Sequence, residues 1–180
     1  MDRMIDSHGI DVHIADEQND HEVNVSKWHR LALDVLIAQG IKGETELSII
    51  YVDEPAIATL NEKFLGHAGP TDVLSFPIED LIMPSGRFPD SGGTSPTWDP
   101  TDDYEAPILL GDVVICPAVA KRNAPEHAGT YEAEMALLLV HGILHILGMD
   151  HEEAEEADLM EAREQDMLSR FFTDGDPSGT

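Results

Sequence analysis

The sequence predicts an α/β (α+β) fold: a single domain with a small mixed sheet of about four strands, packed with about five helices. Two observations lead to this prediction. Short runs of β-branched and apolar residues alternate along the chain with longer segments whose apolar residues recur at helical spacing. The chain also has 180 residues, 42% of them hydrophobic and 26% charged, which suits one soluble globular domain with a sizeable core.

The first part of the chain predicts three strands and two helices. The strands are 10–15, ELSIIYVDE at 46–54 and VLSFPI at 73–78. The first helix has Ser26 as its N-cap and Gly40 as its end, since these residue types favour those positions. Asp53 is suited to cap the second helix. One face of each helix is apolar, with Trp28, Leu31, Val35 and Ala38 on the first and Ile57, Leu60 and Phe64 on the second.

The remaining elements follow a segment without periodicity. ILLGDVVICP at 108–117 predicts the fourth strand, and a short helix is expected around 118–124. The helix that begins at Thr130 is apolar on most sides and is therefore expected to be central and buried, and Gly148 ends it. A last, acidic helix is predicted at about 153–172.

Two segments are expected to lie outside the packed core. Residues 82–107 are rich in proline and glycine and predict a long mobile loop inserted into the domain. The C-terminal tail, 173–180, is expected to be frayed. The single packed domain would then span residues 1–172.

Charge and composition limit the partners and the compartment. The formal net charge of −26 argues against broad electrostatic binding to nucleic acid, and no binding to DNA is expected, although a local basic groove remains compatible with RNA. No apolar run has the length of a membrane span, and the N-terminus has no signal-peptide core. The single cysteine, Cys116, suits a reducing compartment. We therefore expect a cytoplasmic protein that does not enter the membrane.

The stretch HGILHILGMDH has the spacing of a metal site. His141 and His145 are four residues apart and so share one face of a helix. Gly148 lets the chain turn back, so that His151 can become a third ligand. Three imidazoles leave a coordination position for water, which is typical of catalytic zinc. Cys116 is the only cysteine that would close such a site, and its strand context favours a place in the core instead.

This spacing matches the zincin-type proteases, H-E-x-x-H-x-x-G-x-x-H, except at the glutamate that serves them as general base. Gly142 stands at that position. Bound zinc can itself lower the pKa of water to about 7. Glycine also removes bulk and negative charge beside the metal, so the pattern favours phosphodiester over peptide hydrolysis. Asp112 or Asp150 would otherwise have to supply the missing carboxylate.

Other polar residues near the motif leave alternatives open. Asp150 would orient an imidazole, act as a base or cap the last helix. Glu134 lies two turns before His141 on the same helical face, where it either supports a ligand or is exposed. The remaining histidines have no ligand spacing and are interpreted as ordinary structural residues: His8, His13, His21, His29, His67 and His127.

Three motifs together resemble one known family. HGILHILGMDH is similar to the H-G-x-L-H-x-x-G-Y-D-H signature of the YbeY family of zinc-dependent endoribonucleases. GPTDVLSFP at 69–77 and LGDVVICP at 110–117 resemble the P-T-D-V-L-S-F and L-G-D-I-x-I segments of that family, in the same order. The resemblance covers about residues 45–172.

The resemblance implies one zinc ion held by His141, His145 and His151. It implies hydrolysis of single-stranded RNA, with maturation of the 3′ end of 16S rRNA and ribosome quality control as the roles. The partners would be rRNA and the small ribosomal subunit or its assembly factors. Ser75 and Asp112 match the strand motifs and would line the cleft as candidate catalytic residues, with a buried strand serine and a turn former as the alternatives.

The sequence departs from the family pattern at two positions. Leu65 stands where the family often has an arginine before P-T-D-V-L-S-F, and Met149 replaces the usual tyrosine. Lys121 and Arg122 either supply the missing charge or, as their pattern favours, belong to a solvated face. Two other functions therefore stay open: a metallopeptidase with a displaced catalytic carboxylate, and a non-enzymatic, zinc-containing ribosome-assembly factor.

Overall fold

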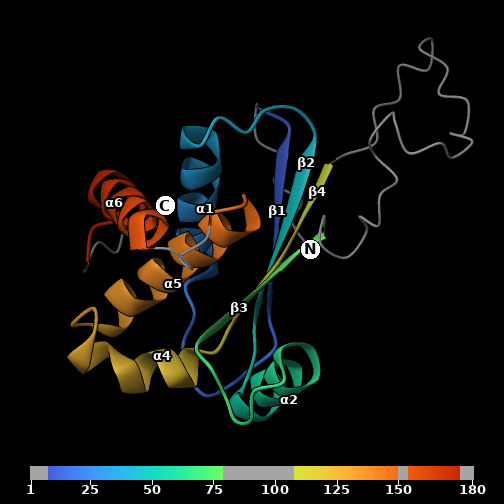
Figure 1. Cartoon of the computed structure of the whole chain (residues 1–180), viewed down its shortest axis with the longest axis vertical. Helices are drawn as coiled ribbons and strands as arrows, with labels where there is room; N and C mark the ends of the chain where they lie inside the picture. The colour runs from blue at the N-terminus through green and yellow to red at the C-terminus, as the bar shows by residue number, and fades with distance from the viewer. Residues whose placement is uncertain (1–7, 79–107, 150–153, 175–180) are drawn as a thin grey trace, which may run out of the picture.

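A computed structural model describes residues 8–78, 108–149 and 154–174 (Figure 1). The strands are β1 (Ile10–Asp16), β2 (Thr45–Tyr51), β3 (Val73–Pro77) and β4 (Ile108–Ile115). The helices are α1 (Val25–Ala38), α2 (Glu54–Leu65), α4 (Pro117–Asn123), the 3-10 helix η1 (Ala124–Glu126), α5 (Tyr131–Ile146) and α6 (Ala154–Phe171).

The four strands form one mixed sheet in the order β1-β2-β4-β3. β1 and β4 pair with β2 in parallel, whereas β3 pairs with β4 antiparallel. The register between β2 and β4 shifts between Glu46 and Leu47, which leaves one extra residue on β4 at this point. The α/β fold class and the mixed sheet predicted from the sequence are confirmed.

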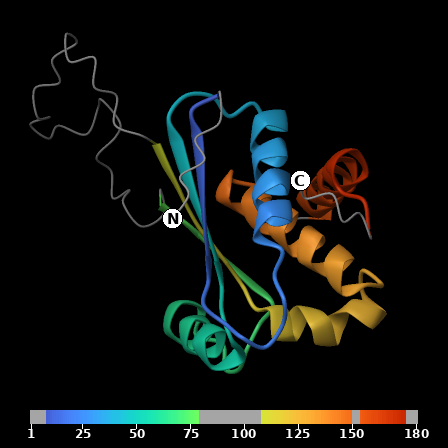
Figure 2. The ribbon, with the colours of Figure 1, turned by 180° about the vertical axis from the view of Figure 1, so that it is seen from behind.

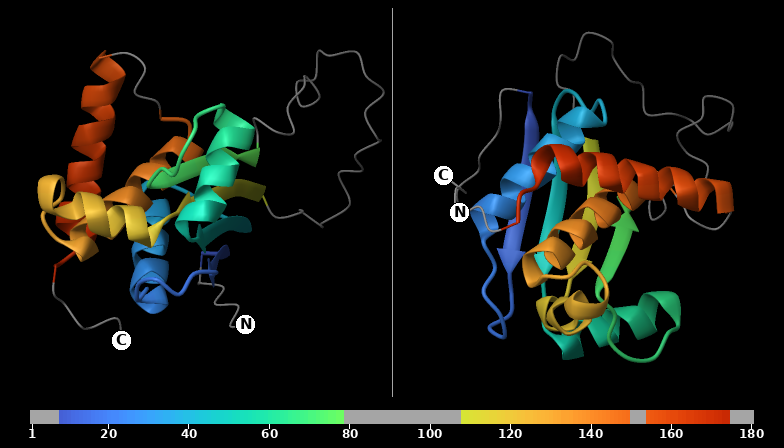
Figure 3. Two further views of the ribbon diagram at one scale, coloured as in Figure 1. Left: turned by 90° about the horizontal axis from the view of Figure 1, so that it is seen from below. Right: turned by 90° about the vertical axis from the view of Figure 1, so that its left-hand side faces the viewer.

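Helices lie on both faces of the sheet. α1, α5 and α6 lie on one side of the strands and α2 on the other, as the view from behind shows (Figure 2). In Figure 3, right, α5 and α6 cross in front of the strands. The side chains of Val113 and Ile115 belong to the large core beneath α1 and α5. Val114 and Leu74 belong to a smaller cluster that α2 covers.

The helix ends follow local capping chemistry, with one correction. α1 is capped by the side chain of Asn24, which accepts from the backbone N–H of Lys27, so the predicted cap at Ser26 is wrong. The predicted cap of α2 is confirmed, since the side chain of Asp53 accepts the backbone N–H of Ala56. α5 begins where it was expected, and the side chain of Thr130 caps it by accepting the backbone N–H of Ala133.

Some sequence predictions fall outside the described residues. These are the loop at 82–107 and the tail from residue 175 onward. Within the described part of the chain, no helix is long and apolar enough to cross a membrane.

Candidate metal centre

Two of the three predicted metal ligands converge. His141 and His145 project from α5 with their ring centroids 4.5 Å apart and their planes at 75°. Their Nε2 atoms lie 3.0 Å from each other. His151 and Asp150, the other candidates from this motif, lie outside the described residues. The helical spacing therefore brings the first two imidazoles to one point, as predicted.

A carboxylate from α6 supports this pair, and sequence reasoning missed it. Glu164 contacts Nδ1 of His141, and only 8% of the residue is exposed. A carboxylate beside Nδ1 accepts a hydrogen bond from the Nδ1–H, and this tautomer leaves the lone pair of the imidazole on Nε2. One signal was present in the sequence: Glu164 falls on the same helical face as the buried Met160 and Met167, where an exposed acid is not expected.

The donor set fits a zinc ion. Zinc–imidazole bonds of about 2.0–2.1 Å at a tetrahedral angle place two ligand nitrogens about 3.3 Å apart. The 3.0 Å separation of the two Nε2 atoms is close to that value and also suits one N–H···N hydrogen bond, which an ion would replace. The Glu164–His141 contact is the carboxylate–histidine support that metal-bound imidazoles usually have.

Gly142 has a packing role that the motif alone does not reveal. A Cβ built at this position would lie 2.6 Å from Cγ1 of Val113 on β4 and 3.4 Å from Oγ of Ser75 on β3. The Ser75 hydroxyl donates a hydrogen bond to the carbonyl of Gly142, at 3.1 Å. Gly142 therefore faces the sheet, and its missing side chain lets α5 lie directly against the strands. Ser75 joins β3 to the ligand helix beside His141.

Asp112 is not brought to the histidines. It lies between Gly111, whose added Cβ would meet Ile146 of α5, and Val113, which belongs to the core beneath α5. Successive residues of a strand point to opposite faces, so Asp112 points to the face away from α5. As a replacement for the missing base, Asp112 is on the wrong side of the sheet.

The same far face carries a second group of possible metal ligands. Within the described residues, Asp11, His13 and Glu46 form the group whose ligand atoms all lie within 4.8 Å of one another. Nε2 of His13 is 3.2 Å from Oδ2 of Asp11. These residues sit on β1 and β2, whose neighbouring core residues face the helices, so the sheet separates this group from His141 and His145.

The remaining candidates lie away from the histidine pair. Cys116 is buried in the smaller cluster, and burial raises the pKa of its thiol, which disfavours the thiolate that a metal needs. Leu65 is exposed at the end of α2. Arg122 pairs with Glu54, and the ammonium group of Lys121 lies over the ring of Tyr131.

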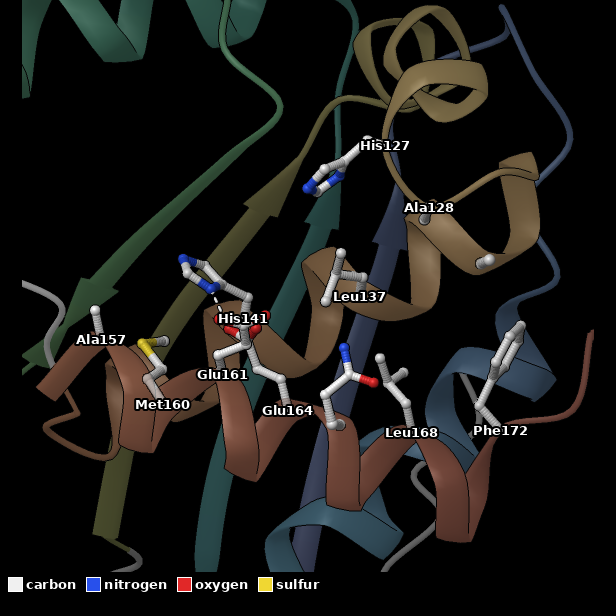
Figure 4. Close-up of a pocket in the computed structure, with 12 residues that line it drawn as sticks. His127, Ala128, Leu137, His141, Ala157, Met160, Glu161, Glu164, Leu168 and Phe172 are labelled. Carbon is white, nitrogen blue, oxygen red and sulfur yellow. Dashed lines mark hydrogen bonds and ion pairs between the residues drawn. The ribbon is translucent and has the colours of Figure 1, made fainter. Parts of the chain in front are cut away.

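Two cavities flank the ligand helix. The larger, about 560 Å³, lies between the start of α5 and α6, and both His141 and Glu164 line it (Figure 4). The smaller, about 250 Å³, is lined by His145 and by the ends of β3 and β4. The histidine pair therefore borders open space on both sides of α5. The larger volume lies in the range of small-ligand sites, about 300–1,000 Å³.

Glu134 has a different partner from those the sequence suggested. It is fully buried, so the exposed alternative is wrong. Its two carboxylate oxygens lie 2.9 and 2.8 Å from Nδ1 of His127, and one of them accepts the backbone N–H of Ala128 at 3.2 Å. His127 lines the larger cavity together with His141 (Figure 4).

Comparison with known proteins identifies the family. The family model described as Endoribonuclease YbeY matches residues 13–172. The chain belongs to the YbeY family. Its relatives include three proteins from different bacteria that carry the name Endoribonuclease YbeY. The protein of Corynebacterium kroppenstedtii is 36% identical over 94% of this chain and 78% of its own length. The protein of Acidothermus cellulolyticus is 44% identical over 80% of this chain and 81% of its own length. The protein of Moorella thermoacetica is 36% identical over 87% of this chain and 94% of its own length.

A solved structure also aligns with nearly the whole chain. The solution structure of TM1509 from Thermotoga maritima has a TM-score of 0.49 and 26% identity, covering 93% of this chain and 98% of that one. The YbeY assignment depends on the family model and the curated relatives, which confirm the resemblance drawn from the three sequence motifs.

Proposed function

We propose that this protein is a zinc-dependent endoribonuclease that cleaves single-stranded RNA. Its roles would be maturation of the 3′ end of 16S rRNA and ribosome quality control in the cytoplasm, with the small ribosomal subunit or its assembly factors as partners. Membership of the YbeY family supports RNA cleavage, because the relatives are named endoribonucleases. The observation that carries the proposal is the convergence of Nε2 of His141 and Nε2 of His145 at 3.0 Å.

In this proposal, His141, His145 and His151 hold one zinc ion. Bound zinc supplies a hydroxide near neutral pH and polarises a phosphoryl oxygen. The protein's own part is to fix the ligands. Glu164 holds the ring of His141 through Nδ1, and the packing of Gly142 on Val113 sets how close α5 lies to the sheet.

The cavity beside the ligands suits a segment of single-stranded RNA. Its walls come from α5, α6 and the residues that follow η1, and its apolar lining includes Leu137, Leu168 and Phe172. Apolar and aromatic surfaces accept bases by stacking without reading sequence. Because the net charge is −26, we expect long-range attraction to contribute little, so that recognition depends on contacts inside the cavity.

The two alternatives have less support. A metallopeptidase would need a displaced carboxylate, and Asp112 points away from the histidines across the sheet. A non-enzymatic assembly factor is favoured by the net charge of −26 and by Leu65, which lies at the end of α2 on the opposite side of the sheet from α5 (Figure 2). The identity of residue 65 therefore says little about the metal centre.

The test compares metal-loaded wild-type protein with His145→Ala on a single-stranded RNA oligonucleotide, its duplex and a peptide mixture. We expect cleavage of the single strand only, lost in the His145→Ala variant together with its bound metal, as measured by elemental analysis. His67→Gln serves as a control, because His67 is exposed and follows the end of α2, which lies on the opposite side of the sheet from α5 (Figure 2). Equal RNA cleavage by wild type and His145→Ala, or cleavage of peptides instead, would rule the proposal out.

A further inference from the structure

RNA hydrolysis at the histidine pair needs a group that delivers a proton. Hydrolysis of a phosphodiester leaves an alkoxide that must be protonated, and side chains that do this typically contribute about 10²–10⁴-fold to the rate. In zinc proteases with the same histidine spacing, the glutamate at the position of Gly142 transfers protons. Here Gly142 faces the sheet, and Asp112 lies beyond it.

The titratable groups that line the larger cavity are the candidates for the proton donor. In the described part of the chain they are His127, His141, Glu161 and Glu164. His141 is a candidate ligand and Glu164 holds its Nδ1. Glu161 is exposed on α6, and among the described residues no hydrogen bond or ion pair fixes its carboxylate. His127 is the remaining group, and histidine is the side chain that most often serves as a general acid.

His127 is held in a geometry suited to proton transfer. Its Nδ1 lies 2.8 and 2.9 Å from the two oxygens of Glu134, so the Nδ1–H donates a hydrogen bond to the carboxylate. The other nitrogen, Nε2, takes no part in this contact. The side chain of His127 is 59% exposed, whereas that of Glu134 is fully buried. A buried, fixed carboxylate behind an accessible imidazole is the arrangement that orients histidine in many acid–base sites.

Glu134 is also fixed by its place on the ligand helix. It lies two turns before His141 on α5 and accepts a second hydrogen bond from the backbone N–H of Ala128. The same rigid helix therefore positions the metal ligand directly and His127 through Glu134. Figure 4 shows His127 and His141 both on the wall of the larger cavity, which a single nucleotide segment would share.

We propose that His127 is the general acid of RNA cleavage and that Glu134 is its positioning residue. This inference rests on the proposed endoribonuclease function. A bond forms between phosphorus and a water oxygen, and the bond between phosphorus and the leaving ester oxygen breaks. The proton on Nε2 of His127 moves to the leaving oxygen, and the proton released by the attacking water restores the imidazolium. One water is consumed and no redox partner is needed.

The test compares cleavage of RNA with two leaving groups, one that needs a proton and one that does not. An RNA oligonucleotide is prepared with sulfur in place of the leaving ester oxygen at the mapped cleavage position, because a thiolate departs without being protonated. On the ordinary RNA, His127→Gln should be at least about 100-fold slower than wild type. On the sulfur-containing RNA, the two proteins should differ by less than about threefold, since the acid is no longer needed.

Companion variants separate this role from folding and metal binding. Glu134→Gln should show the same dependence on the leaving group with a smaller defect, and His67→Gln should behave as wild type on both substrates. Thermal unfolding and bound metal should be unchanged in His127→Gln, since the side chain is more than half exposed and is not a proposed ligand.

The outcomes distinguish this inference from the proposed function. Equal losses on both substrates would show that His127 binds RNA or supports structure, and would overturn the general-acid assignment while leaving the nuclease intact. Loss of metal from His127→Gln would overturn it as well. If wild-type protein cleaves neither substrate, the proposed function fails and the inference fails with it.

Discussion

Replacing Gly142 by alanine tests whether glycine at this position is a packing requirement. The added Cβ would lie 2.6 Å from Cγ1 of Val113, about 1 Å closer than the ordinary contact distance of roughly 3.5–4.0 Å between carbons. Val113 is fully buried, and a β-branched side chain has few rotamers in which to move away. Either α5 must lift from the sheet or Val113 must be strained.

The expected cost follows from two opposing terms. Overpacking a core by one methyl group costs about 1–3 kcal/mol, whereas replacing glycine by alanine inside a helix gains about 1 kcal/mol. Gly142→Ala should therefore lower the free energy of unfolding by about 0–2 kcal/mol. In a Val113→Ala background the clash is absent, so the same substitution should raise stability by up to about 1 kcal/mol.

A double-mutant cycle on these two positions isolates the contact. The free energy of unfolding is measured by urea unfolding followed by circular dichroism. A chelator is present so that metal binding does not add to stability. The coupling free energy between the two substitutions should be about 1–3 kcal/mol. Additive effects, within about 0.5 kcal/mol, would mean that α5 accommodates a side chain at this position and that the packing argument is wrong.

Three further predictions concern the centre and the fold. Glu164→Gln should weaken metal binding about 10–100-fold in a competition titration, whereas Glu161→Gln, on the same helix but exposed, should leave it unchanged. Burial raises the pKa of the Tyr131 phenol to about 12, so its contribution to stability is fully present below about pH 10 and is lost as the pH rises towards 12. Tyr131→Phe should flatten that loss in denaturant titrations. Asp53→Ala should lower the free energy of unfolding by about 1 kcal/mol, because it removes the cap of α2.

Local sequence patterns predicted the helices and strands well, because these elements depend on residues only a few positions apart in the sequence. The helical periodicity gave α5 and the pairing of His141 with His145, since residues four apart share a face in any α-helix. The cap of α1 was placed at Ser26 instead of Asn24 because both residue types cap helices and only the backbone geometry separates them.

Contacts between distant segments were out of reach of such patterns. Glu164 meets His141 across 23 positions of sequence, and no local rule specifies how α6 crosses α5. The face occupied by Asp112 depends on strand alternation, and the motif does not say which face of the sheet the ligand helix covers. His127 has no ligand spacing, so the motif predicts no role for it. Its contact with Glu134 joins residues only seven positions apart, at the start of α5.

The chemistry of the centre and the packing of its helix are linked through Gly142. Because a side chain at this position would enter the sheet, a glutamate there would meet Val113 instead of a water beside the ligands. A single substitution to glutamate would therefore not restore the protease base. Among the described residues, α6 and the residues that follow η1 line the larger cavity beside α5, and after η1 Glu134 holds His127, the proposed acid. The absence of one side chain thus accounts both for the close contact of α5 with the sheet and for the need of an acid elsewhere.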